Sequence, residues 1–377
     1  MDYGFDVSDL TGAQTAEDIG QDDVLRFDRG EYTPFEELVH RLGLLPDTPP
    51  RTFNYRLSVH GRVTHDSMDR YLRAPGNSSS LLKHALNSPR HYYIASRQVL
   101  PACRAPHFEL GTFVHSAILE PDMFAKVHVE PDANRSTRDG VLELIRFYAD
   151  TLGAPVDYDL DAMKHNALRM VLRNLEDHAR DEGHTFISED DRAVIDVIRA
   201  SYATYGGGVL PRLMRHAKIE TSMYGRDAAT GLRVKIRPDG MILSESLGIN
   251  LIVSVKTTST TSVEAFLRDC AKYRYELAEG MYLDVASAIT GRPFSGTLMI
   301  MAQTVMPYQV AAIYWDAEDL QIGKYKYRQA LDIVKQCSDA DVWPGFDSKA
   351  ESGSYGIIQG KLPDYIKSEL LPQYLPE

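Results

Sequence analysis

The spacing of apolar residues changes abruptly at about residue 218, and this change constrains the fold more than any other feature of the sequence. From 122 to 215 the apolar residues recur mostly at helical spacing. From 218 to 258 polar and apolar residues alternate, and turn residues at 225–231 and 248–250 interrupt the alternation. This alternating part predicts three consecutive β-strands.

The chain continues with a second helical pattern and two apolar segments. Apolar residues three and four positions apart between 263 and 285 predict a long helix. The segments at about 296–304 and 308–315 predict two further strands, and a last helix is expected at about 318–337. Helices, three strands, a helix and a strand pair together predict an α/β protein whose mixed sheet has helices on its faces.

The composition is typical of a soluble globular protein. The chain has 377 residues, 25% of them charged, and no apolar run approaches the roughly 18 residues of a membrane span. Cys103, Cys270 and Cys337 lie far apart, which excludes a disulfide framework and the spacing of a zinc site. The first residues do not resemble a signal peptide, so we expect a cytoplasmic protein with no membrane partner.

Negative charge is concentrated in the first 50 residues. This segment holds 12 of the Asp and Glu residues and only three Arg, whereas the whole chain has a net charge of −12. The remaining residues are therefore close to neutral and can include a basic groove, so the net charge does not exclude DNA as a partner. The acidic segment itself is expected to be a solvated extension or to dock a basic partner.

Three charged residues are predicted to meet at one edge of the sheet. Lys256 lies at the end of the third predicted strand, where Ser254 and Lys256 point to the same face because side chains alternate along a strand. An inward lysine requires a partner for its charge, and Asp239 and Glu220 on the neighbouring strands are the nearest acids. Oxygen ligands suit Mg²⁺, and a neighbouring lysine can orient a water molecule.

These residues alone leave a second interpretation open. Lys256 and Asp239 can form a purely structural ion pair, or each can be solvated at a strand end.

The order of five sequence segments resembles the PD-(D/E)XK nuclease superfamily, and within it the exodeoxyribonuclease VIII (RecE-like) and RecB-like exonucleases. The segments are SSSLL at 78–82 with SPRHY at 88–92; LGTFVH at 110–115 with LEP at 119–121; RPD at 237–239; VKTT at 255–258; and YRY at 273–275 with Tyr282, followed by WPG at 343–345. The resemblance covers about residues 77–346.

The resemblance implies a restriction-endonuclease-like fold, with a mixed β-sheet core flanked by helices, a helical insertion and an acidic N-terminal extension. The extension is expected at 1–75, and the exonuclease-like domain at 76–350, followed by a C-terminal tail at 351–377. Within the domain, the helical part is expected at 122–215 and the catalytic core at 216–316.

The resemblance also implies the roles of individual residues. Asp239, Glu220 and His115 match residues at the metal, Lys256 matches the catalytic lysine, and Tyr282 matches a helix tyrosine near the site. Asp239 and Glu220 count among the catalytic residues as well. The residues expected to contact DNA are Arg237, Thr257, Thr258 and Arg274, and further basic residues available to phosphates are Arg233, Lys235, Arg268 and Lys272.

Two positions depart from the family pattern. Ser254 stands where the family has Asp or Glu, and Ala278 stands where it usually has Gln. A serine hydroxyl is a weak Mg²⁺ ligand, so the metal site is expected to be weaker. In parts of the superfamily the acid has moved to the following helix, where Glu279 lies about 100° from Ala278 and can reach the margin of the site, whereas Glu276 lies about 200° away.

Two functions follow from the sequence. The first is a Mg²⁺- or Mn²⁺-dependent exodeoxyribonuclease that acts on ends of linear double-stranded DNA in phage-type or prophage-type recombination. By resemblance it would work with a single-strand annealing protein and form a homo-oligomer around DNA. The alternative is a catalytically degenerate nuclease fold, marked by Ser254, that binds DNA or protein.

Overall fold

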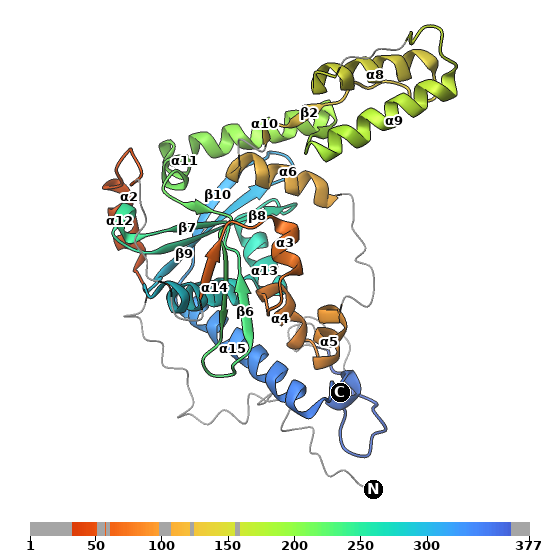
Figure 1. Ribbon diagram of the computed structural model, residues 1–377. Helices are drawn as coiled ribbons and strands as arrows, with labels where there is room; N and C mark the ends of the chain where they lie inside the picture. The colour runs from red at the N-terminus through yellow and green to blue at the C-terminus, as the bar shows by residue number, and fades with distance from the viewer. Residues whose placement is uncertain are drawn as a thin grey trace, which may run out of the picture.

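The computed structural model describes residues 32–50, 57, 61–97, 107–120, 124–154 and 159–362. Sheets form the centre of the molecule, helices cover them, and a helical arm projects from one end (Figure 1). This is the mixed α/β arrangement that the sequence predicts. None of the helices in the described part is long and apolar enough to cross a membrane.

The main sheet has five strands in the order β10-β9-β8-β7-β4. β8 and β9 pair in parallel, and the other neighbours pair antiparallel, so the sheet is mixed as predicted. The strands are β4 (Lys218–Ile219), β7 (Gly240–Ile242), β8 (Leu251–Thr258), β9 (Gly296–Gln303) and β10 (Val310–Tyr314). The predictions for β8, β9 and β10 are confirmed to within a few residues.

A second sheet of three strands lies beside the first, in the order β1-β5-β6. Its strands are β1 (Arg62–Thr64), β5 (Ser222–Arg226) and β6 (Arg233–Ile236). The prediction of three consecutive strands between 218 and 258 is therefore wrong in number, because the structure has five strands there, β4 to β8. Breaks at Glu220 and at Pro238 divide these strands between the two sheets.

Local backbone chemistry explains both breaks. Glu220 separates β4 from β5 and has a φ of 49°, a left-handed conformation that is uncommon for a residue with a side chain. Pro238 separates β6 from β7 and lacks the N–H that would continue a ladder. The two breaks are adjacent because the Glu220 N–H donates to the Asp239 carbonyl at 3.2 Å.

Two layers of helices cover the sheets. On one face the apolar side chains of both sheets pack against helices that include α4, α5, α13, α14 and α15. The bounds of the helices at this end are α3 (Met68–Arg73), α4 (Ser79–Ala85), α5 (Pro89–Arg97), α13 (Val263–Tyr273), α14 (Tyr275–Thr290), α15 (Ala317–Ala340) and η3 (Phe346–Lys349). α14 contacts strands of both sheets and therefore lies under their junction.

The opposite face of the main sheet packs against a second group of helices. They are α2 (Phe35–Gly43), α6 (His107–Leu119), α10 (Glu189–Thr204), α11 (Val209–Met214) and α12 (Ser244–Leu247), with the short η2 (Tyr205–Gly207) between α10 and α11. Val253 and Val255 of β8 belong to this core, whereas Ile252 belongs to the core on the α14 side. The predicted alternation along β8 is thereby confirmed, and it turns Ser254 toward α14.

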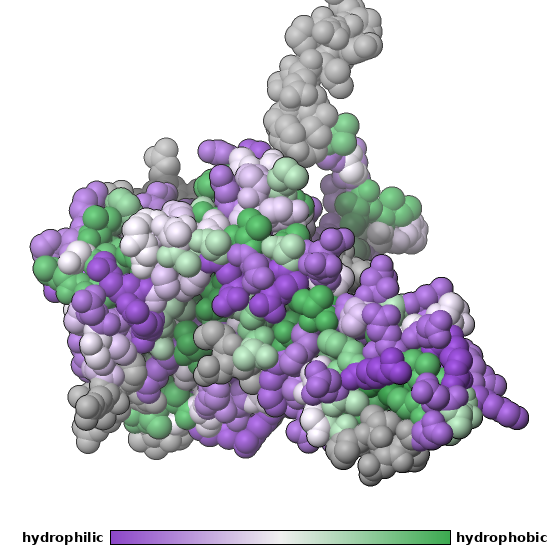
Figure 2. All heavy atoms as spheres, turned by 90° about the horizontal axis from the view of Figure 1, so that it is seen from above, coloured by the Kyte–Doolittle hydropathy of each residue, from purple (hydrophilic) through white to green (hydrophobic). Residues whose placement is uncertain are grey.

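The projecting arm has a core of its own. It consists of α8 (Arg138–Leu152) and α9 (His165–Asp181), with a parallel strand pair at its base formed by β2 (Val127–Val129) and β3 (Thr185–Ile187). Figure 2 shows this arm as the lobe at the lower right, which is covered mainly by hydrophilic side chains with a smaller hydrophobic area among them. The sequence predicts mostly helices here and not these two strands, because strands of three residues are too short to show an alternating pattern.

The predicted helix at 263–285 is two helices. Arg274 has a φ of 54° and ends α13, and α14 begins at the next residue. α14 and α15 then cross at two glycines, where the backbones come into contact. A Cβ at Gly323 would lie 1.9 Å from the Glu276 carbonyl oxygen, and a Cβ at Gly280 would lie 2.4 Å from the Lys324 nitrogen.

We expect Gly323→Ala to destabilise the protein, because the added methyl group meets backbone that no side-chain movement can clear. The free energy of unfolding, measured with urea, should fall by about 1–3 kcal/mol or more. Gly43→Ala in α2 is the matched control, since a Cβ there meets no atom within 4 Å. It should leave stability unchanged or raise it by up to about 1 kcal/mol, and equal losses in both variants would contradict this account of the crossing.

Candidate metal and catalytic site

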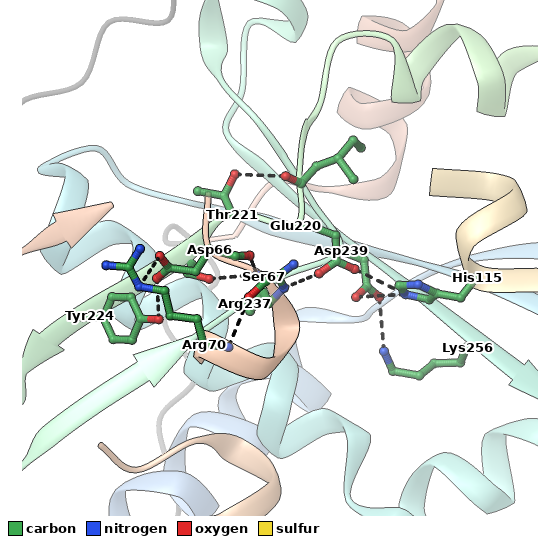
Figure 3. Close-up of polar contacts among 12 residues, drawn as sticks. Asp66, Ser67, Arg70, His115, Glu220, Thr221, Tyr224, Arg237, Asp239 and Lys256 are labelled. Atoms are coloured by element: carbon green, nitrogen blue, oxygen red, sulfur yellow. Dashed lines mark hydrogen bonds and ion pairs between the residues drawn. The ribbon is translucent and has the colours of Figure 1, made fainter. Parts of the chain in front are cut away.

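Three side chains of types that can ligate a metal ion meet where the two sheets separate (Figure 3). His115 comes from α6, Glu220 from the break between β4 and β5, and Asp239 directly precedes β7. One ligand atom of each lies within 4.8 Å of the others. The His115 Nε2 is 3.3 Å from Asp239 Oδ1 and 3.8 Å from Glu220 Oε1.

Asp239 is the residue that the other groups contact. Its Oδ2 accepts a hydrogen bond from the Val255 N–H at 2.5 Å and lies 3.4 Å from the Lys256 Nζ. Burial alone would raise the pKa of this carboxyl, but the Lys256 ammonium and then the His115 contact hold it well below its usual range. Asp239 is therefore a carboxylate at any physiological pH.

The acids of the site raise the pKa values of its two basic residues, Lys256 and His115. Burial would lower the pKa of Lys256, yet the Asp239 and Glu279 carboxylates raise it. Burial would likewise lower the pKa of His115, but its hydrogen bond to Asp239 and the nearby charges raise it. Lys256 is thus a charged donor rather than a base, and a proton on His115 lies between two acids.

Glu220 is held by Arg237. The guanidinium of Arg237 forms an ion pair with Glu220 Oε2 and also donates to the Asp66 carbonyl and, at 3.0 Å, to Ser222 Oγ. Burial, and then the charge of Asp239, raise the pKa of Glu220, and Arg237 opposes this effect. The side chain of Arg237 is only 7% exposed, so the expected DNA contact does not fit its position, and its observed partners make it a positioning residue for Glu220.

Lys235 is a second basic residue that the structure removes from the surface. It is 6% exposed, and its Nζ donates to the carbonyls of Tyr71, Leu72 and Ala74 at 2.7–3.1 Å. These carbonyls lie at the end of α3, a segment whose structure the sequence leaves ambiguous. The expectation that Lys235 is available to phosphates is therefore wrong.

Glu279 occupies the neighbourhood of the missing strand acid. Its Oε1 accepts a hydrogen bond from Ser254 Oγ at 2.7 Å, and both side chains are fully buried. Its Oε2 has no hydrogen-bond partner among the described residues. Burial raises the pKa of Glu279 to about 7, while Lys256 and Ser254 oppose the rise. Glu276 points elsewhere, to Lys326 Nζ at 2.7 Å.

Tyr282 lies one helical turn beyond Ala278 and close to the acids. Burial raises its pKa, and the charges of Asp239 and Glu279 raise it further. The side chain of Ser79 hydrogen-bonds Tyr282. Tyr282 is therefore near the site, as expected, and tied to α4.

The remaining predicted DNA contacts lie around the site in structural roles. Thr257 faces α6, where a Cβ at Gly111 would lie 2.7 Å from its hydroxyl oxygen. Thr258 hydrogen-bonds Thr260 at 3.0 Å. Arg274 donates to the Lys83 carbonyl at 2.8 Å and to Asn87 Oδ1 at 2.9 Å.

Sequence reasoning missed Lys83 of α4. Burial, and then the charge of Lys256, lower its pKa to about 8. Its Nζ lies 5.0 Å from the centre of the Tyr275 ring, and the Lys256 Nζ lies 5.9 Å from the same centre. The sequence could have indicated Lys83, because it lies four residues after Ser79 and residues four apart share a helix face.

Comparison with known proteins agrees with this geometry. Residues 209–353 match a family model described as "PDDEXK-like domain of unknown function (DUF3799)". This part of the chain is similar to a PDDEXK-like domain. The fold is accordingly restriction-endonuclease-like, as predicted, and a nuclease-like function is supported.

Two solved structures share low sequence identity with the chain. One is a protein from Eubacterium rectale described as "Putative exonuclease", with 12% identity and a TM-score of 0.43, covering 77% of this chain and 91% of that one. The other is SSO0001, with 12% identity and a TM-score of 0.22, covering 60% of this chain and 85% of that one. No curated protein matches the chain.

The burial of Glu279 predicts a pH-dependent stability. Folding raises the pKa of this carboxyl from 4.5 to about 7, so the folded chain binds the proton more tightly than the unfolded chain. The contribution of this group is therefore most favourable below pH 4.5 and is lost as the pH rises through 7. In EDTA, the unfolding free energy of wild type relative to Glu279→Gln should fall between pH 5 and pH 8, by no more than about 3 kcal/mol. A difference that is the same at both pH values would contradict the assignment.

Proposed function

We propose that this chain is a metal-dependent deoxyribonuclease. The observation that carries the proposal is the buried Glu279 carboxylate on Ser254, which brings a further acid to a group that already holds Asp239, Glu220, His115 and Lys256. The serine on the strand was the main reason to suspect lost chemistry. A carboxylate 2.7 Å from its hydroxyl supports an intact site instead.

The residues present fit a divalent metal ion. Asp239 and Glu220 supply the carboxylate oxygens that Mg²⁺ and Mn²⁺ prefer, and His115 can add an imidazole nitrogen. When bound, the ion would supply positive charge to the scissile phosphate and activate water for attack on phosphorus. Its binding must displace the proton that the two acids favour on His115, so affinity should rise with pH.

The protein side chains have separate tasks in this proposal. Lys256, as a charged donor beside Asp239, orients the attacking water and stabilises negative charge that develops on the phosphate. Glu279 raises the pKa of Lys256 and so keeps this lysine protonated. Its carboxylate also adds to the negative charge that a divalent metal ion requires. Arg237 fixes Glu220, and Tyr282 with Ser79 closes the site on the α4 side.

The finer assignment belongs to the proposal as well. By the resemblance, the substrate would be an end of linear double-stranded DNA, digested exonucleolytically in recombination of the phage or prophage type by a RecE-like or RecB-like subtype. A cytoplasmic homo-oligomer that works with a single-strand annealing protein would fit that role. The domain at 76–350 would carry the activity, and residues 1–31 of the acidic extension lie outside the described residues.

Digestion of end-labelled linear duplex DNA with Mg²⁺ or Mn²⁺ tests the proposal. Wild type should shorten the DNA, and Asp239→Ala and Lys256→Ala should each lose activity on the order of a thousandfold, because the metal and the phosphate lose their charged partners. Lys335→Ala on α15 is the control, since Lys335 pairs only with Asp339 among the described residues at the surface. A covalently closed circular duplex should stay uncut if the enzyme requires ends.

Isothermal titration with Mn²⁺ separates this proposal from a degenerate binding module. A functional site predicts binding that Asp239→Ala abolishes. A folded wild-type protein that leaves linear DNA intact and shows no Asp239-dependent metal binding would contradict the enzyme and favour the binding module.

A further inference from the structure

Two tyrosine rings form a short aromatic surface next to the catalytic lysine. Tyr273 ends α13 and Tyr275 begins α14, and their ring centres lie 5.9 Å apart at an angle of 32°. Residues two apart in a regular helix do not face each other. The left-handed conformation of Arg274, with a φ of 54°, brings the two rings together.

This surface is held in place from below and from the side. The Tyr275 ring packs near Phe266, which is 1% exposed, with ring centres 6.4 Å apart. Arg274 is tied to α4 through the Lys83 carbonyl and Asn87 Oδ1. Tyr273 is 48% exposed, whereas Tyr275 is partly buried, so the ring on the catalytic side is half-buried and the other is open to solvent.

The ammonium groups of three lysines lie over the two rings. The Nζ atoms of Lys256 and Lys83 lie 5.9 and 5.0 Å from the centre of the Tyr275 ring. The Nζ of Lys272 lies 5.2 Å from the centre of the Tyr273 ring. Asp269 is the acid that acts on Tyr275 from α13. Aromatic faces with ammonium groups beside them suit a nucleic-acid strand, whose bases stack and whose phosphates require cations.

We propose that Tyr273 and Tyr275 form a stacking step for one unpaired base of the DNA strand, with Lys83 and Lys272 contacting the phosphates on either side of it. This inference rests on the proposed function, in which Lys256 contacts the scissile phosphate. A ring can stack on a base only where the base has a free face, and bases inside a duplex are stacked on their neighbours. The step therefore selects a strand whose terminal bases are unpaired as it enters the site.

Binding of a fluorescein-labelled oligo-dT of 12 nucleotides to the full-length protein, measured by fluorescence anisotropy, tests the step. EDTA in the buffer prevents cleavage. Tyr273→Ala should weaken binding about tenfold, and Tyr273→Phe should bind as wild type, because stacking requires the ring and not the hydroxyl. Tyr325→Ala on α15 removes a tyrosine of similar exposure, 45%, and should bind as wild type. Equal affinity of Tyr273→Ala and wild type, or equal losses in Tyr273→Ala and Tyr325→Ala, would overturn the proposal.

Two further measurements make the test specific. The affinity for a blunt hairpin duplex should be little changed by Tyr273→Ala. If Tyr273→Ala weakens binding of the duplex as much as binding of the oligo-dT, the assignment to an unpaired base is overturned. Lys83→Met should reduce the slope of log K against log salt by about 0.7, as expected for one phosphate contact on a single strand, and an unchanged slope would remove Lys83 from the step.

Failure of this inference is distinguishable from failure of the proposed function. If wild type cuts DNA but Tyr273→Ala binds normally, the step is wrong and the nuclease stands. If wild type binds the oligonucleotide through Tyr273 but cuts no DNA, the step stands and the nuclease is wrong.

Discussion

The partly buried carboxylate of Asp239 is the group on which the rest of the site depends. It accepts the Val255 N–H and lies next to both Lys256 and His115, so a single side chain joins β7, β8 and α6. A charged group in this position is tolerated because cations and an N–H compensate for the lost water. The breaks at Glu220 and Pro238 follow from the same requirement, since they bring two acids from neighbouring strands to one point.

An acid from a helix lies beside the serine of the strand, and we propose that it replaces the acid that the strand lacks. α14 lies under the junction of the two sheets, and the side chain of Glu279 rises from it to Ser254. Gly280 and Gly323 let the backbones of α14 and α15 come into contact where the two helices cross.

Much of this arrangement can be predicted from the sequence. The alternation along 251–258 gives the side of the sheet on which Ser254 and Lys256 lie, and the order of strands brings Asp239 and Glu220 close together. His115 was found only through the resemblance, because nothing in its local sequence distinguishes it from a buried core histidine. Its position 3.3 Å from Asp239 agrees with that expectation.

Other features could not be predicted, for identifiable physical reasons. Arg237 and Lys235 look like surface cations, but their partners lie around Asp66 and Tyr71–Ala74, in a segment without a clear pattern. The break between α13 and α14 depends on the left-handed conformation of Arg274. Because this residue is not a glycine, the sequence does not indicate that conformation. The angle of Glu279 around the helix indicated a contact only at the margin of the site, whereas its carboxylate lies 2.7 Å from the Ser254 hydroxyl.

The central claim is that the Glu279 carboxylate does the work of the acid missing at position 254, and an exchange of positions tests it most directly. Cleavage rates of linear duplex DNA would be compared for wild type, Glu279→Ala and the double variant Ser254→Asp with Glu279→Ala, all folded by circular dichroism. The account predicts that Glu279→Ala is inactive and that the double variant regains cleavage. Full activity of Glu279→Ala, or a double variant no more active than Glu279→Ala, would contradict it.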